Sequence, residues 1–306
     1  MGSTPRPHRY AIPMATRSTD VSVMGDCPGR FALTCFYEKE QAEASFFILG
    51  SQLHETIEVS IVMDLDLDQA LTHARAGIDR ELERIEDAPR KIESSKRGFD
   101  SMHDDAARML RNWYRFVHPD SDKRLEIYDE YQWPPATEVP FHVPAGKGTR
   151  YPQWGRIDAA FIPKSHDFAD QRALVDWKSG TSKQRTSDQL HFYERGYRLA
   201  VAPAVVGIKS WFHHLDRVRK GSIIQEADPY PGDDVVRQRI LATERVKESI
   251  LEDGYVNFNP DWYCNYCPVQ HVCPADGDVR NREINLTNLS RMLSLSRPME
   301  TIERVA

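Results

Sequence analysis

Short apolar runs bounded by Gly, Pro or polar residues alternate along this chain with longer stretches in which apolar residues recur every three or four positions. Short runs of this kind are typical of strands, and the longer periodic stretches are typical of amphipathic helices. The pattern therefore predicts an α/β chain. The expected strands are 156–162, 172–178, 204–212 and its possible partner 221–225, with a strand-like edge at 125–143; the expected helices are a helical region at 67–117, one from about residue 187 and one at 234–251.

Two of the expected strands carry an aspartate each, Asp158 in the first and Asp176 in the second. Side chains alternate faces along a strand, so Asp176 and Lys178 project to the same side, while Val175 and Trp177 take the other. If the two strands pair as a hairpin, the register brings Asp158 beside Asp176. Two adjacent carboxylates repel each other, and a divalent cation such as Mg²⁺ between them makes the arrangement favourable.

The helix that follows places Gln189 and Tyr193 four residues apart, on one face. A lone D-x-K on a strand is usually an exposed edge with a snorkelling lysine. Here an upstream aspartate, apolar flanks and a downstream Q-x-x-x-Y accompany it in order, which favours a metal-dependent phosphodiester site.

The stretches GRIDAAFI, LVDWKSG and QLHFY resemble the RecB-like branch of the PD-(D/E)XK nucleases, in which G-x-x-D, D-x-K-x-G and Q-x-x-x-Y follow in this order. The first aspartate follows Ile157 and not proline, a departure from the superfamily's name. The resemblance implies a restriction-endonuclease-like core, with a mixed central sheet flanked by helices and a helical insertion. It also implies catalytic roles for Asp158, Asp176, Lys178, Gln189 and Tyr193.

A G-x-x-x-H element on a helix supplies a histidine to the metal site in this branch, and Gly50 with His54 matches it. By itself such a histidine is more often a structural or surface residue. His54 is thus expected as a third metal ligand through the resemblance, and His103 is its weaker rival. Glu138 lies where the family often has an acid, and it is expected either to help bind metal or to be an exposed edge residue.

Three cysteines in CNYCPVQHVC form a C-x2-C-x5-C pattern at Cys264, Cys267 and Cys273. In a reducing compartment such spacing favours metal ligation over disulfides, by Zn²⁺ or by an iron–sulfur cluster. The segment D-C-P-x-R-F around Cys27 resembles the N-terminal cysteine of RecB-like nucleases that carry a [4Fe-4S] cluster. The resemblance implies that Cys27 is the fourth ligand of a structural clamp; His271 would complete a zinc site instead.

Composition narrows the class of protein. Charged residues make up 28% of the 306 residues and hydrophobic ones 40%, which is typical of a globular protein. No apolar run approaches the length of a membrane span, and MGSTPRPHRYAIPMATR lacks the apolar centre of a signal peptide, so a cytoplasmic location is expected.

The net charge of −6 argues against a protein that coats nucleic acid through bulk charge. Basic residues nevertheless collect between 178 and 220, either as a DNA groove or as a solvated surface.

The expected organisation is a flexible N-terminus at 1–17, a single nuclease domain at 18–275 and a C-terminal tail at 276–306. Within the domain we expect a helical cap at 67–117, a catalytic core at 125–226 and the cysteine cluster at 264–273, closed by Cys27. No G-x-x-x-x-G-K-[ST] element is present, so no helicase motor of that type is expected in the chain.

The motifs and cysteines together resemble the CRISPR-associated exonucleases of the Cas-four type and their phage relatives. The resemblance implies a DNA exonuclease that uses Mg²⁺ or Mn²⁺, acts on single strands or DNA ends, and serves recombination, repair or end processing. Two alternatives remain open: a nuclease-derived DNA-end-binding adaptor in a recombination or spacer-acquisition complex, and a structure-specific endonuclease. Nothing in the residues specifies a homo-oligomer.

Overall fold

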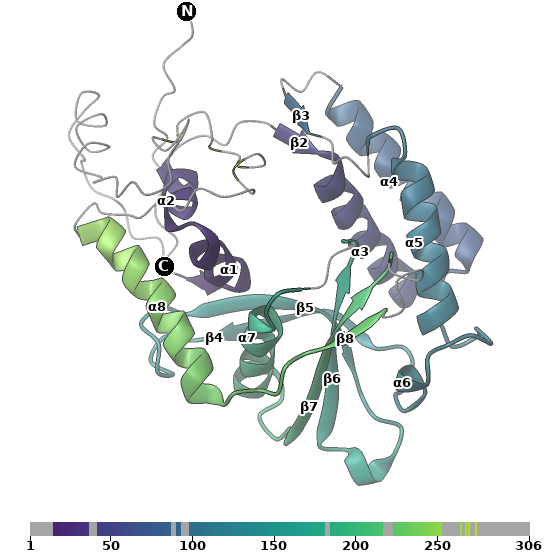
Figure 1. Ribbon diagram of the computed structural model, residues 1–306. Coiled ribbons are helices and arrows are strands. Elements are labelled where there is room, and N and C mark those ends of the chain that lie inside the picture. The colour runs from purple at the N-terminus through teal and green to yellow at the C-terminus, as the bar shows by residue number, and fades with distance from the viewer. Residues whose placement is uncertain are drawn as a thin grey trace, which may run out of the picture. The chain divides into compact units, whose positions relative to one another are not determined.

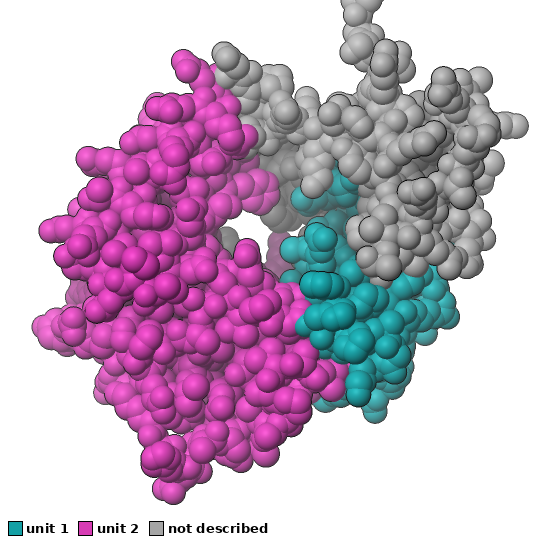
Figure 2. Space-filling view, turned by 180° about the vertical axis from the view of Figure 1, so that it is seen from behind, with its two compact units in different colours: residues 1–42, 142–154, 231–306 teal, residues 43–141, 155–230 magenta. Residues whose placement is uncertain are grey.

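The computed structural model describes residues 15–36, 42–86, 90–92, 98–180, 184–216 and 223–252, and the single positions 264, 267, 269 and 273. Residues 1–14 and the tail at 276–306, for which sequence predictions were made, lie outside this described part. Contacts within the chain define two compact units, which Figure 2 colours separately. Unit 1 comprises residues 1–42, 142–154 and 231–306, and unit 2 comprises residues 43–141 and 155–230.

Unit 2 is built on a mixed β-sheet (Figure 1). β5 pairs with β4 on one side and antiparallel with β6 on the other; β6 is parallel to β7, and β7 is antiparallel to β8. The predicted strands at 156–162, 172–178 and 204–212 are confirmed with small shifts. The strands are β4 (Ala136–Val143), β5 (Gln153–Phe161), β6 (Gln171–Lys178), β7 (Gly207–His214) and β8 (Ile224–Glu226).

Helices cover this sheet, which confirms the predicted class of a mixed sheet flanked by helices. The described residues of the predicted helical region at 67–117 form two helices and the short strand β3, which pairs with β2. No described helix combines the length and apolarity that crossing a membrane requires. The elements are β2 (Ala42–Ala44), α3 (Ser45–Met63), α4 (Leu67–Arg84), β3 (Arg90–Ile92), α5 (Met102–Val117), α6 (Glu126–Asp129), the 3-10 turn η1 (His166–Phe168), α7 (Asp188–Gly196) and the π-helical turn η2 (Tyr197–Val201).

The two faces of β6 divide the unit into a core side and a polar side. Ala173, Val175 and Trp177 join the hydrophobic cluster formed with α3, α4 and α5. Trp177 meets Trp113 of α5 edge to face, with ring centroids 6.4 Å apart, a geometry worth about 0.5–1.5 kcal/mol beyond the area buried. Asp176 and Lys178 therefore project to the opposite side of the strand, as predicted.

The loop between α3 and α4 gives each of the three aspartates in DLDLDQ, residues 64–69, a place at a helix end. Asp64 ends α3 in a left-handed conformation with φ of 51°, Asp66 caps α4, and Asp68 lies in the first turn of α4. The Asp66 carboxylate accepts from the Gln69 amide at 2.8 Å, and the Gln69 side chain accepts from the Asp66 amide at 2.9 Å. This reciprocal capping stabilises the helix start.

One predicted element is corrected. The strand-like edge at 125–143 begins instead as the helix α6, because Tyr128 is buried in the core and its hydroxyl contacts His213 at 2.7 Å; only its last part is a strand, β4. The segment 1–17, expected as a flexible start, is described only at its last residues. Thr16 and Arg17 form β1 (Thr16–Arg17), which pairs in parallel with the first residues of β5.

Unit 1 contains α1 (Ser18–Asp26), α2 (Pro28–Phe36) and α8 (Asp233–Glu252), the helix predicted at 234–251. Lys247 of α8 is fully buried, and its ammonium group lies 2.9 Å from the Asp20 carboxylate and 2.6 Å from the Ala15 carbonyl oxygen. Glu244, one turn earlier, accepts hydrogen bonds from the backbone amides of Arg150 and Tyr151. α8 thus holds together three segments that are distant in the sequence.

Candidate functional site

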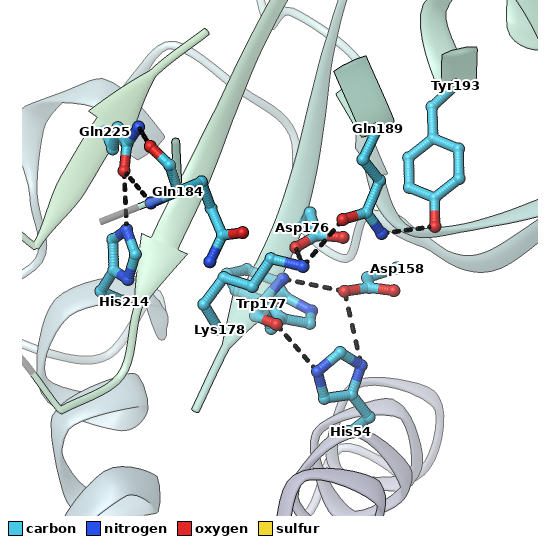
Figure 3. Close-up of polar contacts among 10 residues, drawn as sticks. All are labelled: His54, Asp158, Asp176, Trp177, Lys178, Gln184, Gln189, Tyr193, His214 and Gln225. Atoms are coloured by element: carbon cyan, nitrogen blue, oxygen red, sulfur yellow. Dashed lines mark hydrogen bonds and ion pairs between the residues drawn. The ribbon is translucent and has the colours of Figure 1, made fainter. Parts of the chain in front are cut away.

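The predicted hairpin brings the two aspartates to one face of the sheet. β5 and β6 pair antiparallel with Ala159 opposite Val175, and the same register carried one residue further sets Asp158 opposite Asp176. Residues directly opposite one another project to the same side of an antiparallel pair. The amide of Trp177 donates to Asp158 Oδ2 at 2.8 Å, which fixes the Asp158 carboxylate against β6 (Figure 3).

His54 reaches this carboxylate from α3. Its Nδ1 lies 3.4 Å from Asp158 Oδ2, and its Nε2 lies 2.8 Å from the carbonyl oxygen of Trp177 (Figure 3). Gly50, one turn earlier, lies against the end of β6, where an added Cβ would stand only 3.3 Å from Ser179 Oγ. The glycine of G-x-x-x-H therefore permits the close approach of helix and strand that positions His54.

The acids around His54 control its protonation. Burial alone would lower the pKa of His54, but the charges of Asp158 and Asp176 and the contact with Asp158 outweigh burial and raise it to about 9. Without a metal ion, the imidazole is thus a cation at neutral pH, and both ring nitrogens donate. A bound metal ion would have to displace this proton.

Glu138 joins the same cluster from β4. His54, Glu138 and Asp158 each offer one ligand atom, and these atoms lie within 4.8 Å of one another. Glu138 has a left-handed backbone, with φ of 47°, which is uncommon for a residue other than glycine. Its side chain forms an ion pair with Arg156. Glu138 is thus close enough to His54 and Asp158 for the three side chains to share a cation, and its role in metal binding stays a prediction.

The chemistry of these donors fits a hard divalent cation, because imidazole and carboxylate groups are ligands of Mn²⁺, and carboxylates of Mg²⁺. Burial and the charge of Asp158 raise the pKa of Glu138, so a cation would relieve repulsion there. His103, the rival histidine, lies elsewhere: its Nε2 is 3.0 Å from Asp79 of α4.

Asp176 lies beside this group and not within it. Its side chain is buried, and its Oδ2 lies 2.5 Å from the Lys178 ammonium group without forming a hydrogen bond of good geometry. Burial raises the pKa of Asp176 to about 6, the Lys178 charge opposes the rise, and the Asp158 charge adds to it. The carboxylate therefore keeps acceptor capacity that a cation could use.

Lys178, Gln189 and Tyr193 form a continuous hydrogen-bonded chain. Lys178 Nζ donates to Gln189 Oε1 at 2.9 Å, and Gln189 Nε2 donates to the Tyr193 hydroxyl at 2.9 Å (Figure 3). The predicted helical face is confirmed, since both side chains come from α7 and meet one turn apart. The chain holds the lysine beside Asp176 and restricts where its ammonium group can lie.

Gln225 of β8 belongs to this arrangement, although the sequence pattern did not indicate it. Its side-chain amide accepts from the backbone amide of Gln184 and donates to the Gln184 carbonyl oxygen, both at 2.9 Å. His214 Nε2 contacts the same Gln225 Oε1 at 3.1 Å (Figure 3). Gln225 thereby fixes the backbone of Gln184, which lies between Lys178 and α7 in the sequence. No spacing signal could have revealed it, because its role depends on the tertiary fold.

The cysteines lie in unit 1. Cys27 stands at the junction of α1 and α2, where the amide of Arg30 points at its sulfur at 3.4 Å. Burial raises the pKa of Cys267, with added contributions from the charges of Cys27 and Cys264, while Arg30 opposes the rise. The amide of Cys267 donates to the Cys264 carbonyl oxygen at 3.1 Å, as a C-x2-C turn requires. Cys273 is half-buried, and His271 lies outside the described part of the chain.

Comparisons with known proteins agree with this geometry. A family model described as the PD-(D/E)XK nuclease superfamily matches residues 18–274, which is more than half of the chain. A search of curated proteins finds no match. The order of the motifs, the register of β5 and β6 and the family match together lead to one conclusion: the chain belongs to the PD-(D/E)XK nuclease superfamily.

Proposed function

We propose that this protein is a metal-dependent deoxyribonuclease, an exonuclease that digests single-stranded DNA during recombination, repair or DNA-end processing. The observation that carries the proposal is the meeting of His54, Glu138 and Asp158 beside the Asp176–Lys178 pair on one sheet face. Membership of the nuclease superfamily supports phosphodiester hydrolysis. The choice of an exonuclease and of single strands rests on the resemblance of the motifs to the Cas-four type.

His54, Asp158 and Asp176 would hold one or two Mg²⁺ or Mn²⁺ ions, with Glu138 as an additional ligand. The ion supplies Lewis-acid polarisation of the scissile phosphate and lowers the pKa of the attacking water. The hydrogen bond from the Trp177 amide positions the Asp158 carboxylate to bind the ion, and the place of His54 on α3 positions its imidazole.

Lys178 has the electrostatic role. Its ammonium group lies on the same face as the acids, where it would orient water or stabilise negative charge that develops on the phosphate. Gln189 and Tyr193 keep it in place through the hydrogen-bonded chain described above. Removal of such a positioned charge typically costs about 10²–10³-fold in kcat.

The direct test is cleavage of end-labelled linear and circular single-stranded DNA with Mg²⁺ or Mn²⁺. We expect the wild-type protein to degrade the linear strand, and the Asp176→Asn and Lys178→Ala variants to lose about 10²-fold or more in rate. His103→Ala is the matched control, because it removes a histidine that pairs with an aspartate outside the site. Undiminished cleavage by both active-site variants would refute the proposal.

The same assay separates the alternative functions. Cleavage of the circle would identify an endonuclease, since a closed strand has no end. Binding of DNA ends without cleavage by the wild-type protein, under any metal condition, would identify an end-binding adaptor. The intact Asp158, Asp176 and Lys178 argue against the adaptor.

We further propose that Cys27, Cys264, Cys267 and Cys273 hold a [4Fe-4S] cluster that clamps unit 1. Support comes from the charges of Cys27 and Cys264, which contribute to the raised pKa of Cys267, and from the amide directed at the Cys27 sulfur, because such hydrogen bonds are typical at cluster sulfurs. Protein purified without oxygen should show the visible absorption of a cluster and about four irons per chain. A colourless protein with about one zinc per chain would favour a zinc site with His271 instead.

A further inference from the structure

Arg156 lies on the catalytic face of β5, although neither the motif reading nor the family match assigns it a role. It is two residues from Asp158, so both side chains project to the same side of the strand. The buried Ile157 between them faces the other way. The Arg156 side chain is 70% exposed, and within the described part of the chain its ion-pair partner is Glu138. A solvated guanidinium group therefore stands at the edge of the candidate metal site.

Glu138 is shared between two possible partners. Its carboxylate pairs with Arg156, and it also offers a ligand atom to the group formed with His54 and Asp158. A divalent cation in that group would compete with the guanidinium for the same carboxylate, and the two cations would repel each other. Arg156 would be released at small cost, because its own side chain is 70% exposed and can be rehydrated, while the divalent cation would replace its charge beside the less exposed Glu138.

A released arginine has an obvious ligand in a nuclease. The site presents several carboxylates, Glu58, Glu138, Asp158 and Asp176, whose charges influence one another, and these would repel the DNA backbone. A guanidinium group binds phosphate through paired hydrogen bonds and always keeps its charge. Lys178 already contacts Asp176 and Gln189, and its side chain is only 20% exposed, compared with 70% for Arg156. Arg156 is therefore the cation more accessible to a DNA phosphate.

We propose that Arg156 is a DNA-phosphate ligand that Glu138 holds in reserve. In the metal-free protein the guanidinium group pairs with Glu138. When Glu138 turns to a divalent cation, Arg156 turns to a phosphate of the substrate strand. This inference rests on the proposed function, and it couples metal binding to DNA binding through one carboxylate.

The experiment measures two affinities separately and needs no catalysis. Mn²⁺ binding is followed by calorimetry without DNA, and binding of a labelled single-stranded oligonucleotide is followed by fluorescence anisotropy across a salt series. The second series is run in Ca²⁺ and again in EDTA, with the length of the oligonucleotide verified afterwards. The variants are Arg156→Gln, Glu138→Gln and the double variant. Arg84→Gln is the matched control, because it removes an exposed arginine that pairs with Glu81 on α4.

We expect Arg156→Gln to bind Mn²⁺ several-fold more tightly and DNA about tenfold more weakly in Ca²⁺, with the slope of log affinity against log salt reduced by about 0.7. In EDTA the difference in this slope between the wild-type protein and Arg156→Gln should be smaller than in Ca²⁺. Glu138→Gln should weaken Mn²⁺ binding yet strengthen DNA binding in EDTA, and the added Arg156→Gln change should abolish that gain. Arg84→Gln should alter neither the Mn²⁺ affinity nor the difference between Ca²⁺ and EDTA.

An unchanged salt slope for Arg156→Gln in Ca²⁺ would overturn the inference, as would an equal effect of this variant in Ca²⁺ and EDTA. Either result leaves the proposed nuclease intact if the wild-type protein cleaves DNA. Failure of the wild-type protein to cleave DNA with any metal refutes the proposed function instead, and the two failures are thereby distinguished.

Discussion

At the scale of single residues, the site depends on charges that oppose one another in a small space. His54 is held as a cation by Asp158 and Asp176, and Asp176 keeps a raised pKa despite the neighbouring Lys178. His54 therefore carries a proton that a metal ion must displace before it can bind the imidazole, whereas Asp176, with a pKa of about 6, is mostly ionised at neutral pH. Proton release should be a signature of the site.

The pKa of His54 predicts how metal binding depends on pH. The pKa of His54 is raised from 6.5 to about 9 in the metal-free protein, so the imidazole is almost fully protonated at pH 7.5. It must therefore lose about one proton when Mn²⁺ binds. Mn²⁺ affinity should accordingly rise as the pH increases from about 6 to 9. Calorimetry in buffers of different ionisation enthalpy counts the released protons. Release that persists unchanged in the His54→Gln variant would contradict this assignment.

The same pKa has a consequence for stability without metal. A raised histidine pKa contributes stability that is fully present below pH 6.5 and lost as the pH rises through about 9. We expect the free energy of unfolding in EDTA to fall between pH 7 and 10, by on the order of 1 kcal/mol after allowance for solvent screening. Denaturant unfolding of the wild-type and His54→Gln proteins checks this, and equal slopes in both would argue against it.

The placement of most of the candidate site residues could be predicted from the sequence because it follows from local periodicity. Asp158, Asp176 and Lys178 share a face by strand alternation, and Gln189 and Tyr193 share one by helical spacing. Arg156 and Gln225 could not be predicted in the same way. Their partners, Glu138 and the backbone of Gln184, are distant in sequence and meet them only in the folded unit.

At the scale of elements, Phe141 explains two glycines near the site. A Cβ added at Gly155 of β5 or at Gly196 of α7 would overlap the Phe141 ring. The same ring packs against Phe192 and Tyr193, with centroids 5.7 and 6.2 Å away. The glycine of G-x-x-D is thus required for packing between strand and helix, and not for an unusual backbone angle.

We expect Gly155→Ala and Gly196→Ala to destabilise the protein by about 1–3 kcal/mol each, because a rigid aromatic ring in a packed core has little room to move. Gly180→Ala is the matched control, since no atom of the described residues lies within 4 Å of an added Cβ there. Denaturant unfolding of the three variants measures the difference. Equal stability for all three would show that Phe141 does not constrain these positions.

The predicted elements agree with the structure where apolar periodicity is regular and differ where tertiary contacts decide. The strands at 156–162 and 172–178 and the helix at 234–251 were predictable from pattern alone. The prediction of a strand-like edge at 125–143 was wrong for the first part of this stretch, because burial of Tyr128 stabilises the short helix α6. The left-handed turn at Glu138 within β4 likewise has no local signal, since the residue is not glycine.

At the scale of the whole molecule, each unit is assembled from separate segments of the chain. Unit 1 draws on three segments, and α8 contacts the other two through Lys247 and Glu244. The sequence could not reveal this division, because it depends on contacts between residues more than 200 positions apart, such as Asp20 and Lys247. The single nuclease domain expected at 18–275 from the sequence remains a prediction.

The buried Lys247–Asp20 pair should dominate the stability of unit 1. Asp20→Ala would leave a fully buried ammonium group without its carboxylate, a change that typically costs about 3–5 kcal/mol. Asp234→Ala on the same helix α8 removes an exposed partner of Arg237 and should cost less than about 1 kcal/mol. Hydrogen exchange of the backbone amides of α1 and α8 measures the effect of each variant, and we expect a larger loss of protection in Asp20→Ala than in Asp234→Ala. Equal protection in the two variants would contradict the importance of the buried pair.

The central claim is that a divalent cation binds where His54, Glu138 and Asp158 converge beside Asp176. Anomalous diffraction from crystals soaked in Mn²⁺ would locate the ion most directly. We expect an anomalous peak within about 2.0–2.3 Å of an imidazole nitrogen of His54 and a carboxylate oxygen of Asp158, and we expect this peak to be lost in the Asp158→Asn variant. Saturating Mn²⁺ that leaves this position empty, or an ion held only at a distant surface, would contradict it.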